Sequence, residues 1–231
     1  ILLTNGVTLT PRLLRELKQA GLTGFTMHID SHQERPGWRD KDEAEHNELR
    51  QHYADLVADE GEITLVFNST VYPSTFVEIP DVVRWGQKNI DRVHGLVFIT
   101  YRTLDTEANV ALDSEGGAVD ASQLGYSSER FDETFVTSPE VCQIIKDTCP
   151  EYHPAGYLGG TVRHDSFKWL AGVVLGSRDG WYGSVGKETM EVAQAGHHLL
   201  RGTYLAYPAA TRVSPLVFLM SPWDATLRQA A

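Results

Sequence analysis

Short apolar segments alternate with stretches of helical periodicity over about the first hundred residues. Leucines after Thr10 and Pro11 follow helical spacing as far as Gly21, which predicts a helix with a capped start and a glycine stop. Further helices are expected at 42–59 and 77–89. The apolar and β-branched segments predict strands at 1–4, 25–30, 63–71 and 96–100.

This alternation determines the expected fold class. Short buried strands that alternate with helices form parallel βαβ units. The expected four strands and three helices amount to about half of a (β/α)₈ barrel, although half of a doubly wound sheet has the same order of elements. We therefore predict an α/β protein with a partial, TIM-like (β/α) barrel of parallel strands. The three helices should lie on one side of the sheet.

The pattern changes after the fourth expected strand. Residues 103–136 are acidic and rich in Gly, Ser and Asp, which is typical of a linker or insertion. A capping box at 137–140 then opens a helix that ends before Pro150, and another helix is expected near 188–200. The predicted domains are a partial barrel at 1–102, a linker or insertion at 103–136 and an α-rich C-terminal extension at 137–231.

The composition excludes several classes of protein. Of 231 residues, 42% are hydrophobic and 22% are charged, which are ordinary values for a globular protein. The net charge of −11 argues against a general nucleic-acid binder, because phosphate contacts need clustered Lys and Arg. No apolar run approaches the roughly 18–20 residues of a membrane span, and no signal segment opens the chain. We expect a soluble, cytoplasmic protein.

The start of the chain and its two cysteines add two further expectations. The sequence begins Ile1-Leu2-Leu3 without a methionine, inside an expected strand, so we expect an upstream part to be missing. Cys142 and Cys149 are separated by two helical turns, or about 10 Å. A disulfide needs Cα atoms within about 7 Å. We therefore expect both cysteines to be reduced and partly buried.

Polar residues stand where the expected strands end. In both candidate architectures the chemistry lies at the carboxyl ends of the strands. The side chains of these residues are donors or acceptors suited to hydroxyl, amino or carboxylate groups. The structural alternatives are a tight turn at Asn5, a loop cap at Asp30 and an internally bonded Asn68. The candidate binding residues are Thr4, Asn5, His28, Asp30 and Asn68.

The same segments carry a family resemblance. Leu3-Thr4-Asn5-Gly6, then a helix ending at Gly21, then His28-Ile29-Asp30, resemble the middle of the radical SAM enzyme domain in order and spacing. Val66 to Val71 and Glu78-Ile79 continue the likeness, where that family often has an Asn in an apolar strand before a Glu-Ile helix start. The resemblance covers about residues 1–102.

The resemblance implies two cofactors. In that family a Cys-x3-Cys-x2-Cys loop holds a [4Fe-4S] cluster, and electron transfer from the cluster cleaves S-adenosylmethionine to a 5′-deoxyadenosyl radical, while the protein supplies position and a dry pocket. It further implies an electron donor such as flavodoxin or ferredoxin, and a small-molecule or peptide substrate whose identity cannot be read from the sequence.

Individual residues carry over by position. Thr4 and Asn5 match positions beside the bound cofactor, and Asn68 matches a polar residue that faces it. His28 and Asp30 match positions near the ribose, although the family commonly has Ser where His28 stands. Catalytic residues cannot be assigned.

The cluster loop itself is not in this sequence, which has two cysteines. A site-differentiated cluster needs three thiolates. We expect the cluster cysteines upstream of Ile1, and we expect this chain alone neither to assemble a cluster nor to cleave S-adenosylmethionine. A lineage without the cluster would fit the sequence equally.

Two other functions stay open. A metal-dependent TIM-barrel hydrolase could use His28, Asp30 and His32 as ligands. A non-catalytic barrel remnant could serve as an interaction module. Arg35 and Arg39, in the loop that follows, could hold an anionic substrate or could belong to a solvated loop.

Overall fold

A four-stranded parallel sheet forms the first half of the protein in the computed structural model, which describes residues 1–101, 113–114, 117–118, 136–159, 167–177, 179–202 and 224–230. The strands are β1 (Leu2–Thr4), β2 (Gly24–His28), β3 (Thr64–Val71) and β4 (Gly95–Thr100). They lie in the order β1-β2-β3-β4, and every neighbouring pair is parallel. The predicted parallel arrangement is confirmed.

Helices connect these strands, and local sequence explains where they begin and end. They are α1 (Pro11–Gln19), α2 (Asn47–Glu60) and α3 (Ile79–Lys88), with short 3-10 turns η1 (Ser31–Gln33) and η2 (Phe76–Glu78). The hydroxyl of Thr10 accepts a hydrogen bond from the backbone N–H of Leu13, as expected for an N-cap. Pro80 stands in the first turn of α3, where its missing N–H costs no hydrogen bond.

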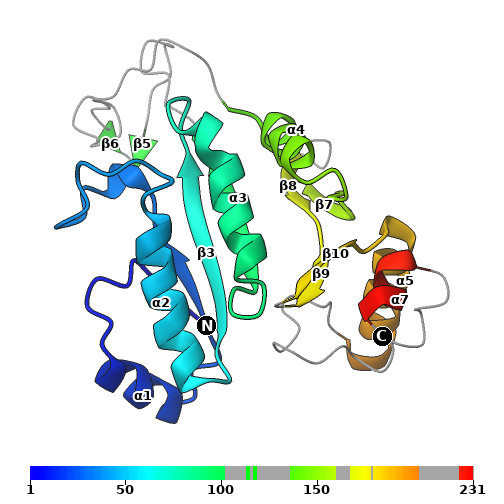
Figure 1. Cartoon of the computed structure of the whole chain (residues 1–231), viewed down its shortest axis with the longest axis horizontal. Helices are drawn as coiled ribbons and strands as arrows, with labels where there is room; N and C mark the ends of the chain where they lie inside the picture. The colour runs from blue at the N-terminus through cyan, green and yellow to red at the C-terminus, as the bar shows by residue number, and fades with distance from the viewer. Residues whose placement is uncertain are drawn as a thin grey trace.

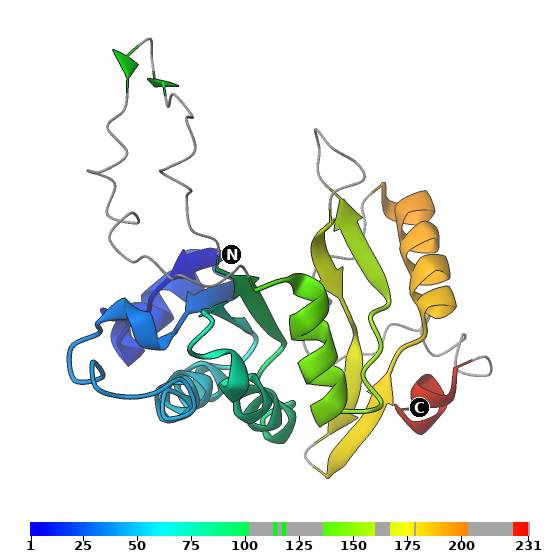
Figure 2. The ribbon, with the colours of Figure 1, turned by 90° about the horizontal axis from the view of Figure 1, so that it is seen from above.

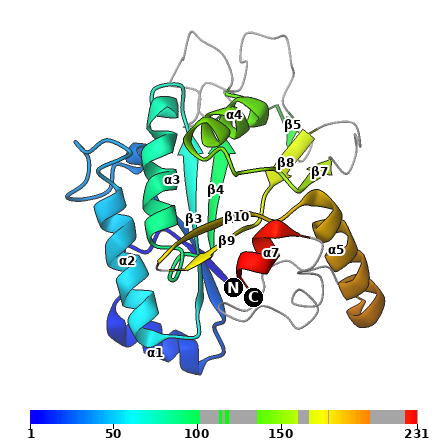
Figure 3. The same ribbon diagram turned by 45° about the vertical axis from the view of Figure 1, so that its right-hand side comes forward.

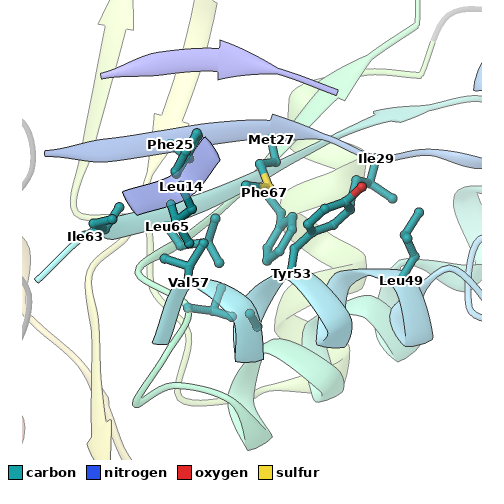
Figure 4. Close-up of a cluster of buried hydrophobic side chains, with 12 residues drawn as sticks. Leu14, Phe25, Met27, Ile29, Leu49, Tyr53, Val57, Ile63, Leu65 and Phe67 are labelled. Carbon is teal, nitrogen blue, oxygen red and sulfur yellow. The ribbon is translucent and has the colours of Figure 1, made fainter. Parts of the chain in front are cut away.

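One face of the sheet is covered by all three helices. Phe25 and Met27 of β2 and Leu65 and Phe67 of β3 point to this helix face, where they are at most 1% exposed. Leu14 of α1 and a row of α2 side chains pack against them, as Figure 4 shows. Burial of this apolar surface is the main stabilising contribution to the sheet and its helix layer. The expectation that the helices share one side of the sheet is confirmed.

A fourth helix extends this layer. Helix α4 (Ser138–Thr148) packs beside α3, and Val141 and Cys149 join Val71, Ile79 and Val83 in a second core cluster. Figure 2 shows α4 between the parallel sheet and the C-terminal half of the chain. The backbone N–H of Thr137 donates to the Glu140 carboxylate, so this helix begins where the capping box predicts.

The C-terminal extension contains strands as well as helices. Two antiparallel pairs are formed by β7 (Gly156–Gly159) with β8 (Phe167–Ala171) and by β9 (Val174–Ser177) with β10 (Gly180–Ser184). Helices α5 (Lys187–Arg201) and α7 (Ala225–Ala230) lie beside them (Figures 1 and 3). The expectation of an α-rich extension is therefore corrected to one that mixes helices and strands. The segment around Trp169 pairs with β7, and the segment around Trp181 pairs with β9.

The segment predicted as a linker or insertion, 103–136, falls almost wholly outside the described residues. Within it the structure describes a short antiparallel pair, β5 (Asp113–Ser114) with β6 (Gly117–Ala118), and the buried Val136. The described parts of the chain contain no helix with both the length and the apolar character that a membrane crossing requires.

Candidate functional site

Parallel pairing brings the carboxyl ends of β1 to β4 to one edge of the sheet. Side chains alternate between the two faces of a strand, and residues paired across a parallel ladder share a face. His28 pairs with Asn68, one position beyond the helix-facing pair of Met27 and Phe67. His28, Asn68 and Thr70 therefore lie on the face opposite the helices, which we call the second face.

A compact hydrogen-bond network is centred on Asp30, which follows β2 and is 2% exposed. His28 Nε2 lies 2.7 Å from Asp30 Oδ2 and 3.1 Å from Thr70 Oγ1. The same carboxylate oxygen accepts from the backbone N–H of Thr70, and Oδ1 accepts from the N–H of His32. Asp30 thus caps its loop, as one alternative predicted, and also holds His28 to the end of β3.

The network holds Asp30 in its ionised form and orients the ring of His28. Burial alone raises the pKa of Asp30, but the hydrogen bond and charge of His28, together with the Thr70 bonds, hold that pKa below its ordinary value. An ionised carboxylate only accepts, so the Nε2–H of His28 is the donor. Whenever the His28 ring is neutral, its Nδ1 is an acceptor, and the side chain is 35% exposed.

Asn68 carries an unsatisfied acceptor beside this network. Its Oδ1 atom is buried and has no hydrogen-bond partner within the part of the chain that the structure describes. Buried amide oxygens are nearly always hydrogen-bonded, because leaving one unpaired costs on the order of 1–3 kcal/mol. The internally bonded alternative for Asn68 is not seen at this atom. The second face therefore has two neighbouring acceptors, on His28 and Asn68, suited to a ligand that donates hydrogen bonds.

Thr4 and Asn5 do not join this group. Thr4 pairs with Met27 in the ladder, so its side chain lies on the helix face. Its hydroxyl accepts from the N–H of Gly6, and Asn5 Oδ1 accepts from the N–H of Val7. The alternation of β1 therefore places Thr4 on the opposite face of the sheet from Asn68. The cofactor contacts expected of Thr4 and Asn5 stay predictions.

An ion pair that the sequence did not predict supports the strand ends from the helix face. Arg50 of α2 is fully buried and pairs with Glu43. The Arg50 guanidinium also donates to the carbonyl of Ile29 at 2.9 Å and to the hydroxyl of Ser69 at 3.0 Å. Glu43 accepts from the N–H of Ser31. These bonds fix the loop after β2. The sequence could not reveal this ion pair, because the spacing of its two charged residues is the same as that of charges on a solvated helix face.

Arg35 is a second buried arginine at this edge. It is 5% exposed, and its Nη2 donates to the carbonyl of His28 and to the side chain of Gln33. Arg39, which is exposed, donates instead to the carbonyl of Glu34. The solvated-loop alternative thus fits Arg39 and is wrong for Arg35.

Aromatic rings from three successive loops stack above the strand ends. The rings of His32 and Tyr72 lie 3.7 Å apart and nearly parallel, and Tyr72 lies 4.8 Å from Tyr101. His32 is therefore engaged in stacking. Among the residues that the structure describes, no three His, Cys, Asp or Glu side chains converge as a metal site, so His28, Asp30 and His32 are not a ligand set.

Both cysteines are free, and they lie in the helix layer away from these strand ends. Comparison of the chain with protein-family models, with curated proteins and with solved structures found no match.

Proposed function

We propose that residues 1–101 form the later part of a radical SAM core domain whose second face contributes to binding S-adenosylmethionine. The observation that carries this proposal is the unsatisfied, buried Oδ1 of Asn68 beside an imidazole that Asp30 orients. It stands at the carboxyl end of a parallel β/α sheet, where such folds bind ligands.

The donors of S-adenosylmethionine suit these acceptors. Its ribose hydroxyls and its ammonium group both donate hydrogen bonds, and Asn68 Oδ1 and His28 Nδ1 accept them. His28 and Asn68 are direct neighbours across the β2–β3 ladder, so one ligand can reach both. The residues of the second face therefore fit this cofactor.

The iron–sulfur cluster does not fit the residues of this chain. A cluster with one open iron needs three thiolates, and the sequence has two cysteines. Burial raises the pKa of Cys149, which disfavours the thiolate that a metal requires. In this proposal the cluster ligands come from outside the 231 residues.

Each residue of the second face has a separate task. When bound with a reduced cluster, S-adenosylmethionine supplies a 5′-deoxyadenosyl radical. Asp30 orients His28 and stays ionised. His28 and Asn68 position the nucleoside by accepting hydrogen bonds.

The test uses the protein encoded by the whole reading frame, reconstituted anaerobically with iron, sulfide and reductant. Binding of S-adenosylmethionine is measured by equilibrium dialysis, and 5′-deoxyadenosine is measured by chromatography. Asn68→Ala should weaken binding about ten-fold, since one desolvated hydrogen bond is worth on the order of 1 kcal/mol or more. The 231-residue chain alone should release no 5′-deoxyadenosine.

Thr26→Val is the matched control. Thr26 lies on the same face of β2, one alternation before His28 and toward the amino end of the strand. Its loss should leave S-adenosylmethionine binding unchanged. Absence of binding by the reconstituted protein, or equal effects of the two substitutions, would overturn the proposal.

A further inference from the structure

Arg35 is a buried cation with unfilled hydrogen-bonding capacity. Nη2 makes both of its bonds within the loop after β2, at 3.1 Å to His28 and 2.9 Å to Gln33. Nε and Nη1 are buried and have no hydrogen-bond partner among the residues that the structure describes. No carboxylate of the described residues lies within ion-pair distance of this guanidinium.

Arg50 shows what a buried arginine needs in this protein. Its Nε is also buried without a hydrogen-bond partner among the described residues, but its guanidinium contacts the Glu43 carboxylate and several further acceptors, so its charge is compensated at contact. Arg35 is 5% exposed, compared with 0% for Arg50, and has only neutral acceptors. Burial lowers the pKa of Arg35, and Tyr53 and Asp30 nearby offset part of that effect. Asp30 accepts from His28, Thr70 and His32 and is not within ion-pair distance of Arg35.

The position of Arg35 is distinct from the second face. Its neighbour Tyr53 belongs to the helix-face core and donates to the carbonyl of Gly6, in the loop after β1. Arg35 therefore lies between the loops that follow β1 and β2. Asn68 is on β3 and faces the other way. A group bound at Arg35 would lie at the same edge of the sheet as a nucleoside on Asn68 but over a different pair of strands.

We propose that Arg35 binds the anionic group, a carboxylate or phosphate, of a second small molecule at the carboxyl edge, separate from the ligand of Asn68. Arginine is the residue that best recognises such groups in a desolvated site, because its N–H bonds are directional and its charge persists. An anion at Nε and Nη1 supplies the compensation that the described residues do not. The protein has a net charge of −11, so the attraction must be local to this guanidinium.

This inference rests on the proposed function in one respect only: the proposed function places S-adenosylmethionine at the same edge of the sheet. If the edge binds S-adenosylmethionine, the anion belongs to the substrate. The substrate class is then an acidic small molecule, with a carboxylate or phosphate group.

The test is anion binding by the 231-residue chain and by the whole protein, with inorganic phosphate and succinate as the probes. Thermal unfolding is followed at rising probe concentration, and sodium chloride keeps the ionic strength constant. Phosphate or succinate should raise the unfolding temperature of the wild-type protein above its value in chloride. Arg35→Met should abolish this dependence, whereas Arg39→Gln, in the same loop, should retain it.

A second measurement separates this site from a purely structural arginine. In sodium chloride alone, without phosphate or succinate, Arg35→Met should keep the wild-type unfolding temperature or exceed it, because it removes an uncompensated buried charge. Arg35→Lys keeps the charge and should retain weakened anion dependence. Equal anion dependence in wild type and Arg35→Met, or no dependence in wild type, would overturn the inference.

The two proposals fail independently. Arg35→Met should leave the affinity for S-adenosylmethionine within about two-fold of wild type, and Asn68→Ala should leave phosphate and succinate binding intact. One pair of results would overturn the second-ligand proposal and assign Arg35 to the cofactor instead. In that case Arg35→Met loses S-adenosylmethionine binding, and the wild-type protein does not respond to phosphate or succinate. Retained anion binding in a protein that does not bind S-adenosylmethionine would overturn the proposed function alone.

Discussion

The hydroxyl of Tyr53 donates to the carbonyl oxygen of Gly6 at 2.8 Å, and this bond joins α2 to the loop after β1 across 47 positions of sequence. Gly6 has a φ of +74°, in the left-handed region that favours glycine. A Cβ at Gly6 would also lie 2.9 Å from Cζ of the same tyrosine ring. Gly6 is therefore required both by the backbone and by the close approach of Tyr53.

Gly6→Ala should destabilise the protein by about 2–3 kcal/mol, since backbone strain adds to displacement of a buried ring. Gly21→Ala is the matched control. Gly21 also has a positive φ, of +95°, but a Cβ there meets nothing within 4 Å. It should cost about 1 kcal/mol from strain alone. Urea denaturation measures both, and equal losses would show that contact with Tyr53 contributes nothing.

Arg50→Met should lower the free energy of unfolding by about 3–5 kcal/mol, because it leaves Glu43 buried without its counterion. The reference is Arg84→Met on α3, whose ion pair with Asp81 is more than half exposed. That substitution should change stability by less than about 1 kcal/mol. The double variant Arg50→Met/Glu43→Gln should lose less than the sum of its single variants. Additive losses in this cycle would contradict a direct pair.

Asp30 should make stability depend on pH in the acidic range. Its folded-state pKa is lowered from the ordinary value of 3.8, so the unfolded chain takes up the proton first. The stabilising contribution is fully present above about pH 5 and is lost as the pH falls through the unfolded and then the folded pKa. Asp30→Asn should flatten the fall in unfolding free energy between about pH 5 and pH 3.

Asp59→Asn, at an exposed position, is the control for the loss of one negative charge in the pH dependence of the unfolding free energy. Unfolding free energies from urea titrations at each pH provide the measurement. If Asp30→Asn follows the wild-type slope and Asp59→Asn does not, the network around Asp30 is not the source of the acid sensitivity.

Cys149 should react slowly with thiol reagents in the native protein. Burial raises its pKa, and the side chain is 2% exposed behind α3 and α4. Alkylation by iodoacetamide at pH 8 should be at least about ten-fold slower in the folded protein than in urea, because only the accessible thiolate reacts. Mass spectrometry of the peptide that contains Cys149 follows the reaction. Equal rates in the two states would mean that α4 does not stay packed on α3.

The parallel sheet and its helices could be predicted because their signals are local. Thr10 and Pro11 mark a helix start, and β-branched runs such as the one ending at Val71 mark buried strands. The face of a strand-end residue could not be predicted in the same way. Thr4 and His28 both end strands, yet the register places them on opposite faces of the sheet.

Buried charge was equally hidden from the sequence. Arg35 and Arg39 are four residues apart in one polar loop, and only the structure separates the buried one from the exposed one. The turn from Arg35 to Trp38 is closed by a backbone hydrogen bond, with Gly37 at a φ of +80°. Its Pro-Gly pair signals a turn but not which side chain the turn directs inward. Tertiary packing decides that point.

The strand order β1-β2-β3-β4 is the order of synthesis. Each strand that leaves the ribosome can add to the edge formed by the strand before it, and no position has to be kept vacant for a later segment. The helix that covers each new pair is made between its two strands, so backbone pairing and burial of apolar surface advance together. The first 101 residues can therefore assemble during translation, before the C-terminal hairpins exist.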